Sequence, residues 1–200
     1  MATDLIARLK SEWFERLDGI VDRSKTIPSS NLKCIELCQQ RCCPRVELRQ
    51  KPPHEVSNSI VVLLPFEMEY LMERTGVARN AFRRWPLALT PDTTIEIGMF
   101  DLGKTCPFLT ENLQCSIYQF YPLDCRTYPL LPFTNYRHEL EWELGGHYPS
   151  LTLLDPNFEG AVKRIWQELL PVLPQAWWDI YAFADHWKGW PNPTENHDAS

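Results

Sequence analysis

Glycine, positive charge and long apolar runs are all scarce in this sequence, and each shortage excludes a class of protein. Eight glycines against 17 prolines among 200 residues indicate short elements joined by stiff turns. Acidic side chains outnumber basic ones by 26 to 20, which gives a formal net charge of −6. Because phosphate binding needs a surplus of Lys and Arg on one face, we expect no nucleic-acid partner.

The apolar runs are too short for a membrane protein. The longest, Ile60 to Phe66, falls far below the roughly 20 residues that span a bilayer. The first residues also lack the basic segment followed by an apolar one that marks a secretory signal. We therefore expect no membrane association and a cytoplasmic location. No Gly-rich phosphate loop, His-Glu-x-x-His or Gly-x-Ser-x-Gly motif occurs, so no catalytic residue can be assigned.

The hydrophobic patterning predicts a small, irregular α+β domain that is centred on a metal, contains a short sheet and is flanked by N- and C-terminal helices. Helices are expected at residues 4–20, 33–43, 66–79, 157–170 and 175–187, and strands at 59–64, 94–100 and 136–144. Residues 83–92 are predicted to be a loop, and residues 106–132 to be largely irregular. In the helix over 66–79, Glu67, Glu69 and Glu73 are expected on the exposed side, and Gly76 is expected near the end.

Strict alternation over Tyr136 to Leu144 places His138 on the apolar side of its predicted strand and Glu139, Glu141 and Glu143 on the solvent side. We expect one domain over residues 1–190 and a polar tail over 191–200. Within the domain, a cysteine-bearing core covers about 30–135, and a strand with Trp-rich helices covers 136–190. The tryptophans of the last part are expected in the core: Trp166, Trp177, Trp178, Trp187 and Trp190.

Seven cysteines in two groups are the most informative feature of the sequence. An odd number of cysteines in a reducing compartment does not suit a disulfide framework. The first group, Cys34, Cys38, Cys42 and Cys43, follows a C-x3-C-x3-C-C pattern. On a helix, the first three thiols would share one face but span roughly 12 Å. Either this helix breaks, or the thiols serve a larger cluster or more than one ion.

The second group, Cys106, Cys115 and Cys125, lies in a Pro-rich segment with spacings of nine and ten residues. Proline beside a ligand fixes the backbone before the metal arrives. Thiolates are the donors that zinc and iron–sulfur clusters take. A single buried cysteine more often fills a core, but two tight groups favour metal binding. The predicted ligands are Cys34, Cys38, Cys42, Cys106, Cys115 and Cys125, with Cys43 as an additional candidate.

A centre with four thiolates carries about two net negative charges, so neighbouring cations are valuable to it. Arg41 precedes Cys42, and Arg126 follows Cys125, which makes both arginines candidates for this role. Structural zinc usually uses paired Cys-x2-Cys knuckles, and this sequence has none. The cysteine pattern therefore favours an iron–sulfur cluster, such as a 4Fe-4S cluster, slightly over zinc.

The second group, with Cys106-Pro-Phe-Leu, Cys115-Ser-Ile-Tyr and Cys125-Arg-x-Tyr-Pro, resembles the YkgJ-type cysteine-cluster family, which has a CxxCxxCC signature. The segment Leu63 to Glu67 is similar to the family's stretch between its two cysteine groups. The resemblance implies a zinc- or iron-chelating domain over about residues 30–135. Here the first motif has three residues between cysteines where the family has two, and no cysteine follows Cys125. His147 is a candidate for the missing ligand, although a lone histidine is more often a packed or surface residue.

Two functions stay open at this point. One is redox or protein-modification chemistry at the metal, which the resemblance supports because a flagellin lysine-methylating protein carries a similar cysteine domain. The other is a non-catalytic module with structural zinc, or one for metal delivery, that binds a protein partner. An open coordination position beside Glu67 or His147 would favour the first, and complete burial of the centre would favour the second. The partner, whether a protein or a small molecule, is not identified.

Overall fold

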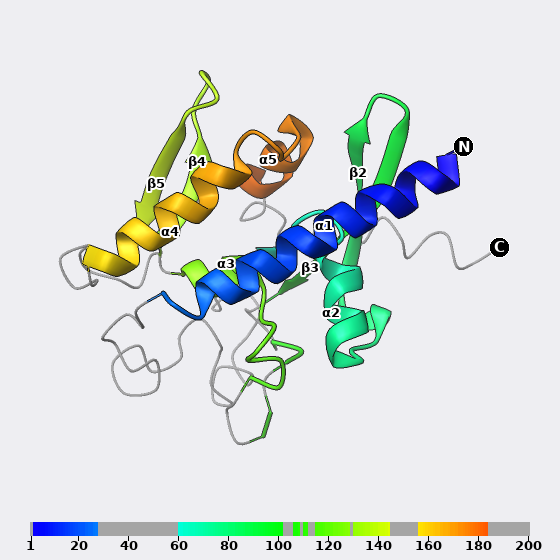
Figure 1. The fold of residues 1–200 in the computed structure, drawn as a ribbon, viewed down its shortest axis with the longest axis horizontal. Coiled ribbons are helices and arrows are strands. Elements are labelled where there is room, and N and C mark those ends of the chain that lie inside the picture. Colours follow the sequence, from blue (N-terminus) through cyan, green and yellow to red (C-terminus); the bar gives the residue numbers. More distant parts are fainter. Residues whose placement is uncertain are drawn as a thin grey trace, which may run out of the picture.

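The structure is a computed structural model, and it confirms the expected α+β class (Figure 1). It describes residues 2–27, 60–101, 106–108, 110–111, 115–128, 130–144 and 156–183. The helices are α1 (Ala2–Ser24), α2 (Glu67–Thr75), the 3-10 turn η3 (Arg79–Ala81), α3 (Leu123–Thr127), α4 (Pro156–Leu169) and α5 (Gln175–Phe183). The strands are β1 (Ile60–Val62), β2 (Arg83–Thr90), β3 (Thr93–Asp101), β4 (Leu130–Thr134) and β5 (Leu140–Leu144).

The larger sheet is antiparallel, with the strand order β1-β3-β2. Its centre is β3, which was predicted from its β-branched and apolar residues and pairs with both neighbours. Gly98 of β3 is needed because a Cβ there would lie 2.8 Å from the Leu63 side chain. The segment after β1 can therefore pass close to β3, where the Leu63 N–H donates to the Gly98 carbonyl.

Strand β2 corrects the prediction of a loop over residues 83–92. Two arginines and Pro86 argued against a strand in the sequence. Among the described residues β2 pairs with β3 alone, and an edge strand tolerates a proline that cannot donate to a ladder. Leu87, opposite Ile95, is fully buried and anchors the strand to the core.

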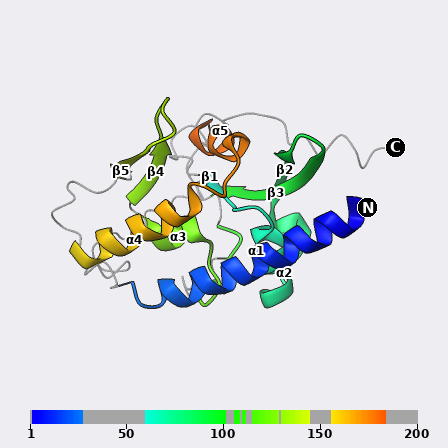
Figure 2. The ribbon, with the colours of Figure 1, turned by 45° about the horizontal axis from the view of Figure 1, so that its top comes forward.

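The sheet separates two hydrophobic clusters, because successive side chains of a strand point to opposite faces. Val62 and Met99 face the larger cluster, which is completed by α1, α4 and α5. Val61 and Phe100 face the smaller cluster, which also contains residues of α2 and the cysteine-bearing segment. Helix α5 lies between the two sheets and contacts β2 and β4 (Figure 2). The expectation that Trp166, Trp177 and Trp178 are core residues is confirmed, whereas Trp187 and Trp190 lie outside the described residues.

Several predicted helices form with different ends. Helix α1 continues past Gly19 to Ser24, because Ile20, Val21 and Ser24 are buried in the continuing turn. Helix α2 is shorter than predicted, since Gly76 takes a left-handed conformation (φ 72°) and ends it. Helices α4 and α5 are confirmed. The predicted helix over 33–43 and residues 184–187 lie outside the described residues, and the division at residue 190 stays a prediction.

The second sheet is the antiparallel pair β4–β5. The predicted strand over 136–144 begins only at Leu140, because the Asn135 side chain accepts the N–H groups of Arg137 and Glu139 and closes a turn. His138 is exposed in this turn with φ 61°, so its prediction as a packed residue of a strand is wrong. The expectation that Glu139, Glu141 and Glu143 face solvent is confirmed.

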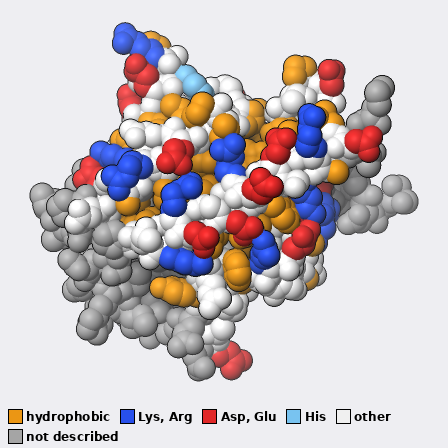
Figure 3. Space-filling view, viewed as in Figure 1, with side chains coloured by type: hydrophobic (Ala, Val, Ile, Leu, Met, Phe, Trp, Pro, Cys, Tyr) orange, Lys and Arg blue, Asp and Glu red, His pale blue; other side chains and the backbone are white. Residues whose placement is uncertain are grey.

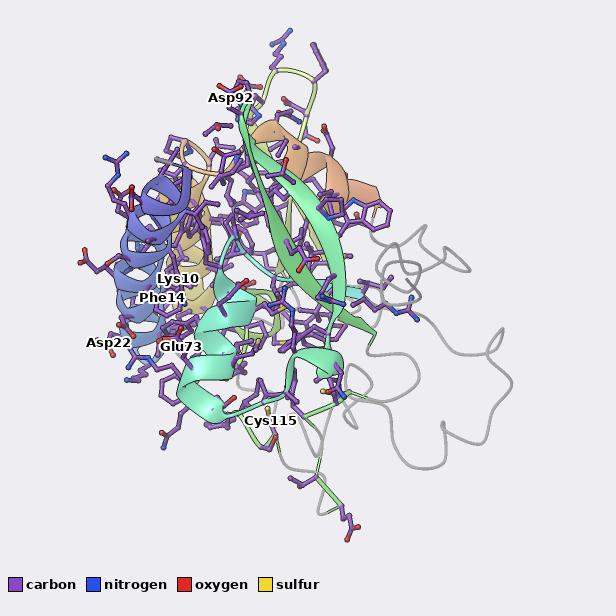
Figure 4. The ribbon with its side chains drawn as sticks, turned by 90° about the vertical axis from the view of Figure 1, so that its right-hand side faces the viewer. Lys10, Phe14, Asp22, Glu73, Asp92 and Cys115 are labelled. Atoms are coloured by element: carbon purple, nitrogen blue, oxygen red, sulfur yellow. The ribbon has the colours of Figure 1, made fainter. Side chains whose placement is uncertain are left out.

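Acidic and basic side chains alternate over the face that carries α1 (Figure 3). Ion pairs connect α1 to its neighbours, for example Arg74 of α2 with Asp18 and Arg23 with Glu168 of α4. Lys10 of α1 also pairs with Glu73 of α2 (Figure 4). Among the described helices, none combines the length and the apolar character that crossing a membrane requires.

Candidate metal centre

Three of the predicted ligands lie in the described part of the chain: Cys106, Cys115 and Cys125. All three belong to the smaller hydrophobic cluster or pack against it. Cys115 lies beyond the end of α2, at the opposite end of the view from Asp92 at the tip of the β2–β3 hairpin (Figure 4). The remaining candidates lie outside the described residues: Cys34, Cys38, Cys42, Cys43, Arg41 and His147.

The first two cysteines are held near each other by the residues that follow them. Phe108 packs edge-on against Phe100 of β3, with ring centroids 5.1 Å apart, which fixes the turn after Cys106. The Ser116 N–H donates to the Phe108 carbonyl at 2.8 Å, so the backbones of the two cysteine motifs are joined directly. Ile117 is buried in the same cluster.

The thiols have contrasting surroundings. Cys106 is buried, and Cys115 and Cys125 are half-buried. Burial raises the pKa of the Cys115 thiol, and the nearby Cys106 raises it further. A hydrogen bond from the backbone of Ile117 and the positive charge of Arg126 act in the opposite direction. Burial and Cys106 therefore disfavour the thiolate form of Cys115, whereas Ile117 and Arg126 favour it.

Cys125 lies in the short helix α3, in a region that was predicted to be irregular. The Pro-rich composition of that region concealed the helix, although Pro122 takes the position just before its first turn, where a proline is tolerated. The residues around Cys125 carry two buried charged groups, Glu67 and Arg126.

Glu67 is 4% exposed, so its prediction on the outer side of the helix is wrong. Phe66 adopts a left-handed conformation (φ 60°), and α2 begins only after this turn, with Glu67 among its buried residues. Its two carboxylate oxygens accept backbone N–H groups, from Leu64 at 2.8 Å and from Leu123 at 3.0 Å. Burial raises the pKa of Glu67, while these two donors and the charge of Arg126 oppose that rise.

Arg126 is 7% exposed and projects from α3 beside Cys125. Its Nε donates to the Tyr121 carbonyl at 2.7 Å, its Nη1 to Ser24 Oγ at 2.7 Å and its Nη2 to the Gln119 carbonyl at 2.8 Å. The guanidinium also lies 4.0 Å from the centroid of the Tyr121 ring. Burial lowers the pKa of Arg126, and the electrostatic influence of Tyr121, Glu67 and Cys125 partly restores it.

The donor chemistry of this region fits zinc or an iron–sulfur centre, since both take soft thiolates in partly apolar surroundings. Among the described residues, no group of three His, Cys, Asp or Glu side chains is placed to hold a metal ion. The described thiols do not form a metal site by themselves. The role predicted for Arg126 beside Cys125 stays a prediction. Sequence reasoning missed the acceptors of its three hydrogen bonds, Ser24 and the carbonyls of Gln119 and Tyr121, because no motif marks them.

The comparison with protein families defines the class of this chain. The CxxCxxCC family, described as "Putative zinc- or iron-chelating domain", matches residues 33–144. This match covers more than half of the chain and spans both cysteine groups, so the protein belongs to the CxxCxxCC family, as the resemblance predicted. No curated protein and no solved structure matches the chain.

Proposed function

We propose that this protein holds a metal in a thiolate centre formed by both cysteine groups. The proposed ligands are Cys34, Cys38, Cys42, Cys106, Cys115 and Cys125, with Cys43 as an additional candidate. The observation that carries the proposal is the arrangement of the second group. Three thiols separated by nine and ten residues lie in or against one hydrophobic cluster, and the hydrogen bond from Ser116 to Phe108 joins the motifs of the first two.

The charge of Arg126 supports the proposal. To described residues, the guanidinium donates three hydrogen bonds, and all of them go to neutral oxygens. A buried cation is costly unless anions compensate for it, and the nearby carboxylate of Glu67 provides part of this compensation without accepting a hydrogen bond from the guanidinium. A metal centre with four thiolates has about two net negative charges, and Arg126 lies where such a charge would be balanced.

Between the two metals that the family description names, we favour an iron–sulfur cluster over zinc. The sequence contains no Cys-x2-Cys pair, which structural zinc sites commonly use. A cluster would bring redox chemistry and would make protein modification or electron transfer the function to test. We place the protein in the cytoplasm, where thiols stay reduced.

A second candidate function is a non-catalytic module in which zinc stabilises the fold or is passed on to a protein partner. One observation favours it: both oxygens of Glu67 are engaged by backbone N–H groups in a buried setting. This carboxylate is therefore buried and already bonded at both oxygens, as a group that fixes the backbone would be. The half-buried Cys115 and Cys125 point the other way, because complete burial of the centre is expected for a purely structural role.

The deciding measurement is the metal and sulfide content of protein purified without oxygen, together with its visible spectrum. Brown protein with iron and acid-labile sulfide would support the cluster. Colourless protein with about one or two zinc ions per chain would support the second function. Well-folded protein that contains no metal, and takes up none on reconstitution, would contradict both.

A further inference from the structure

We infer that Glu67 and Arg126 are positioning residues of the metal centre, which hold helix α3, and with it Cys125, in place before the metal binds. This inference rests on the proposed function. It assigns the two buried charged groups a task that neither the family description nor the cysteine pattern supplies.

The starting point is that α3 is too short to be stable by itself. It has five residues, whereas isolated helices below about 12–15 residues are marginal in water. Contacts with other elements must therefore stabilise α3. Its residues around Cys125 form hydrogen bonds with all four longer helices.

Each of these contacts uses a different residue of α3. Leu123 donates its N–H to Glu67 of α2, and Asp124 accepts the Tyr181 hydroxyl of α5 at 2.9 Å. On the other side of Cys125, Arg126 donates to Ser24 of α1, and Thr127 Oγ1 accepts the indole N–H of Trp166 of α4 at 3.2 Å. Cys125 is thus the one residue of α3 whose two neighbours on each side are all anchored to other helices.

Glu67 couples two distant segments through one carboxylate. One oxygen accepts from Leu64, just before α2, and the other accepts from Leu123, at the start of α3. A carboxylate can accept at both oxygens, but a glutamine amide presents a donor at one of them. Glu67→Gln therefore breaks one of the two bonds and leaves a buried N–H facing another N–H.

Arg126 fixes the spacing between two of the thiols. Its acceptors Gln119 and Tyr121 lie in the loop between Cys115 and Cys125, so the guanidinium closes that loop onto α3. The planar fork of arginine can reach all three acceptors at once, whereas a lysine ammonium is a point charge on a flexible chain. Arg126→Lys keeps the charge and removes the fork.

The consequence is preorganisation. If α3 and the loop are ordered in the metal-free protein, the metal does not have to order them, and affinity rises accordingly. Partners that orient a metal ligand typically contribute 10–100-fold to metal affinity. We expect Glu67→Gln and Arg126→Lys to lower affinity within about that range.

The test uses Co²⁺ as the probe, because its thiolate complexes absorb in the visible range and report the geometry of the site. Metal-free full-length protein is titrated with Co²⁺ without oxygen, and Zn²⁺ affinity follows from displacement of the Co²⁺. The thermal stability of each metal-free variant is measured in parallel. The matched control is Leu87→Ala, which opens a cavity in the larger cluster, on the sheet face away from the thiols.

Positioning predicts that Glu67→Gln and Arg126→Lys bind Co²⁺ about 10–100-fold more weakly and with altered thiolate absorption, while Leu87→Ala binds within about threefold of wild type despite a comparable loss of stability. Wild-type affinity in both variants would overturn the inference, as would an equal loss in the control. Wild-type affinity in Arg126→Lys alone would show that only the charge of this residue matters, which overturns its positioning role.

The experiment has two further possible outcomes. If the two variants do not fold, Ser24→Ala removes a single acceptor of Arg126, and it must weaken Co²⁺ binding by a few-fold for the inference to stand. If the wild type itself takes up no Co²⁺, Zn²⁺ or iron, the proposed function fails, and the inference fails with it. A metal-binding wild type with unaffected variants is a different result, so the two failures are distinguishable.

Discussion

The carboxylate of Glu67 accepts the backbone N–H of Leu123 at 3.0 Å, and this bond joins residues 56 positions apart in the sequence. It places the turn before α2 against the start of α3. With both groups buried, the bond cannot be replaced by water when the side chain is changed.

We expect Glu67→Gln to lower the free energy of unfolding of the metal-free protein by about 1–3 kcal/mol, the cost of leaving a buried donor unsatisfied. Urea denaturation followed by tryptophan fluorescence measures the change. A matched substitution on the outer side of α2, Glu73→Gln, should cost much less, because its exposed ion pair with Lys10 contributes little. Equal losses for both variants would contradict the role of the Leu64 and Leu123 bonds.

Single replacement of Cys106, Cys115 or Cys125 by Ser should lower metal content and melting temperature together, since metal binding is coupled to folding. The loss of affinity should be at least the 10–100-fold expected for a lost supporting residue. Cys43→Ser should have a milder effect. Metal analysis and calorimetry of the same samples check this, and three variants with full metal content and unchanged melting would refute the ligand assignment.

Tyr70 provides a pH dependence that is separate from the metal ligands. Burial raises the pKa of its hydroxyl above the ordinary value of 10.0, and the hydrogen bond that it donates to Asp18 at 2.6 Å acts in the same direction. The folded state therefore holds the proton more tightly than the unfolded state. Its stabilising contribution is complete below pH 10 and is lost as the pH rises through the folded-state pKa.

The comparison of wild type with Tyr70→Phe isolates this effect, because all other groups titrate in both proteins. The difference in free energy of unfolding should be constant from pH 7 to 9 and should shift against the wild type between pH 10 and 11. A difference that does not change with pH would show that the folded and unfolded states release this proton alike.

Gly98→Ala should destabilise the protein by about 1–3 kcal/mol, the usual cost of overpacking a core. The added Cβ would lie 2.8 Å from Leu63 Cδ1 and 3.0 Å from Met68 Cβ. Gly160→Ala is the matched control, because its Cβ would meet only Arg164 at 3.5 Å and alanine favours the helix α4. Thermal unfolding should therefore shift downward for the first variant and slightly upward for the second.

The elements with strong periodicity were predictable from the sequence. The sequences of helices α1, α4 and α5 have clear apolar faces. The sequence of β3 has a run of β-branched residues, and this run forms a strand in the structure. Strand β2 was not predictable. Pro86 is tolerated because β2 lies at the edge of the sheet, and that position is known only from the structure. Tertiary position, not local sequence, decides such a case.

In the candidate site, too, some residues were predictable from the sequence and others were not. Spacing and residue type predicted Cys106, Cys115, Cys125 and Arg126, because thiolates and a neighbouring cation suit a metal whatever the fold, and their roles stay predictions. Glu67 was placed on the wrong side of α2, since the left-handed conformation of Phe66 shifts the helix start and helical periodicity cannot reveal it. The donor to its carboxylate is the backbone N–H of Leu123, and because every residue except proline has such a group, the sequence does not indicate which one is used.

The sheet that separates the two hydrophobic clusters also separates the described thiols from most of the buried aromatic residues. The face with α1, α4 and α5 has its own buried aromatic residues, including Trp166 and Trp177 with ring centroids 6.0 Å apart, and contains none of the described thiols. Without metal, this face and the helix α3 anchored to it would keep their packing, so a rise in amide hydrogen exchange would be confined to the segment around Cys106 and Cys115. The metal-free and metal-bound forms would then differ at that segment and not in the larger cluster.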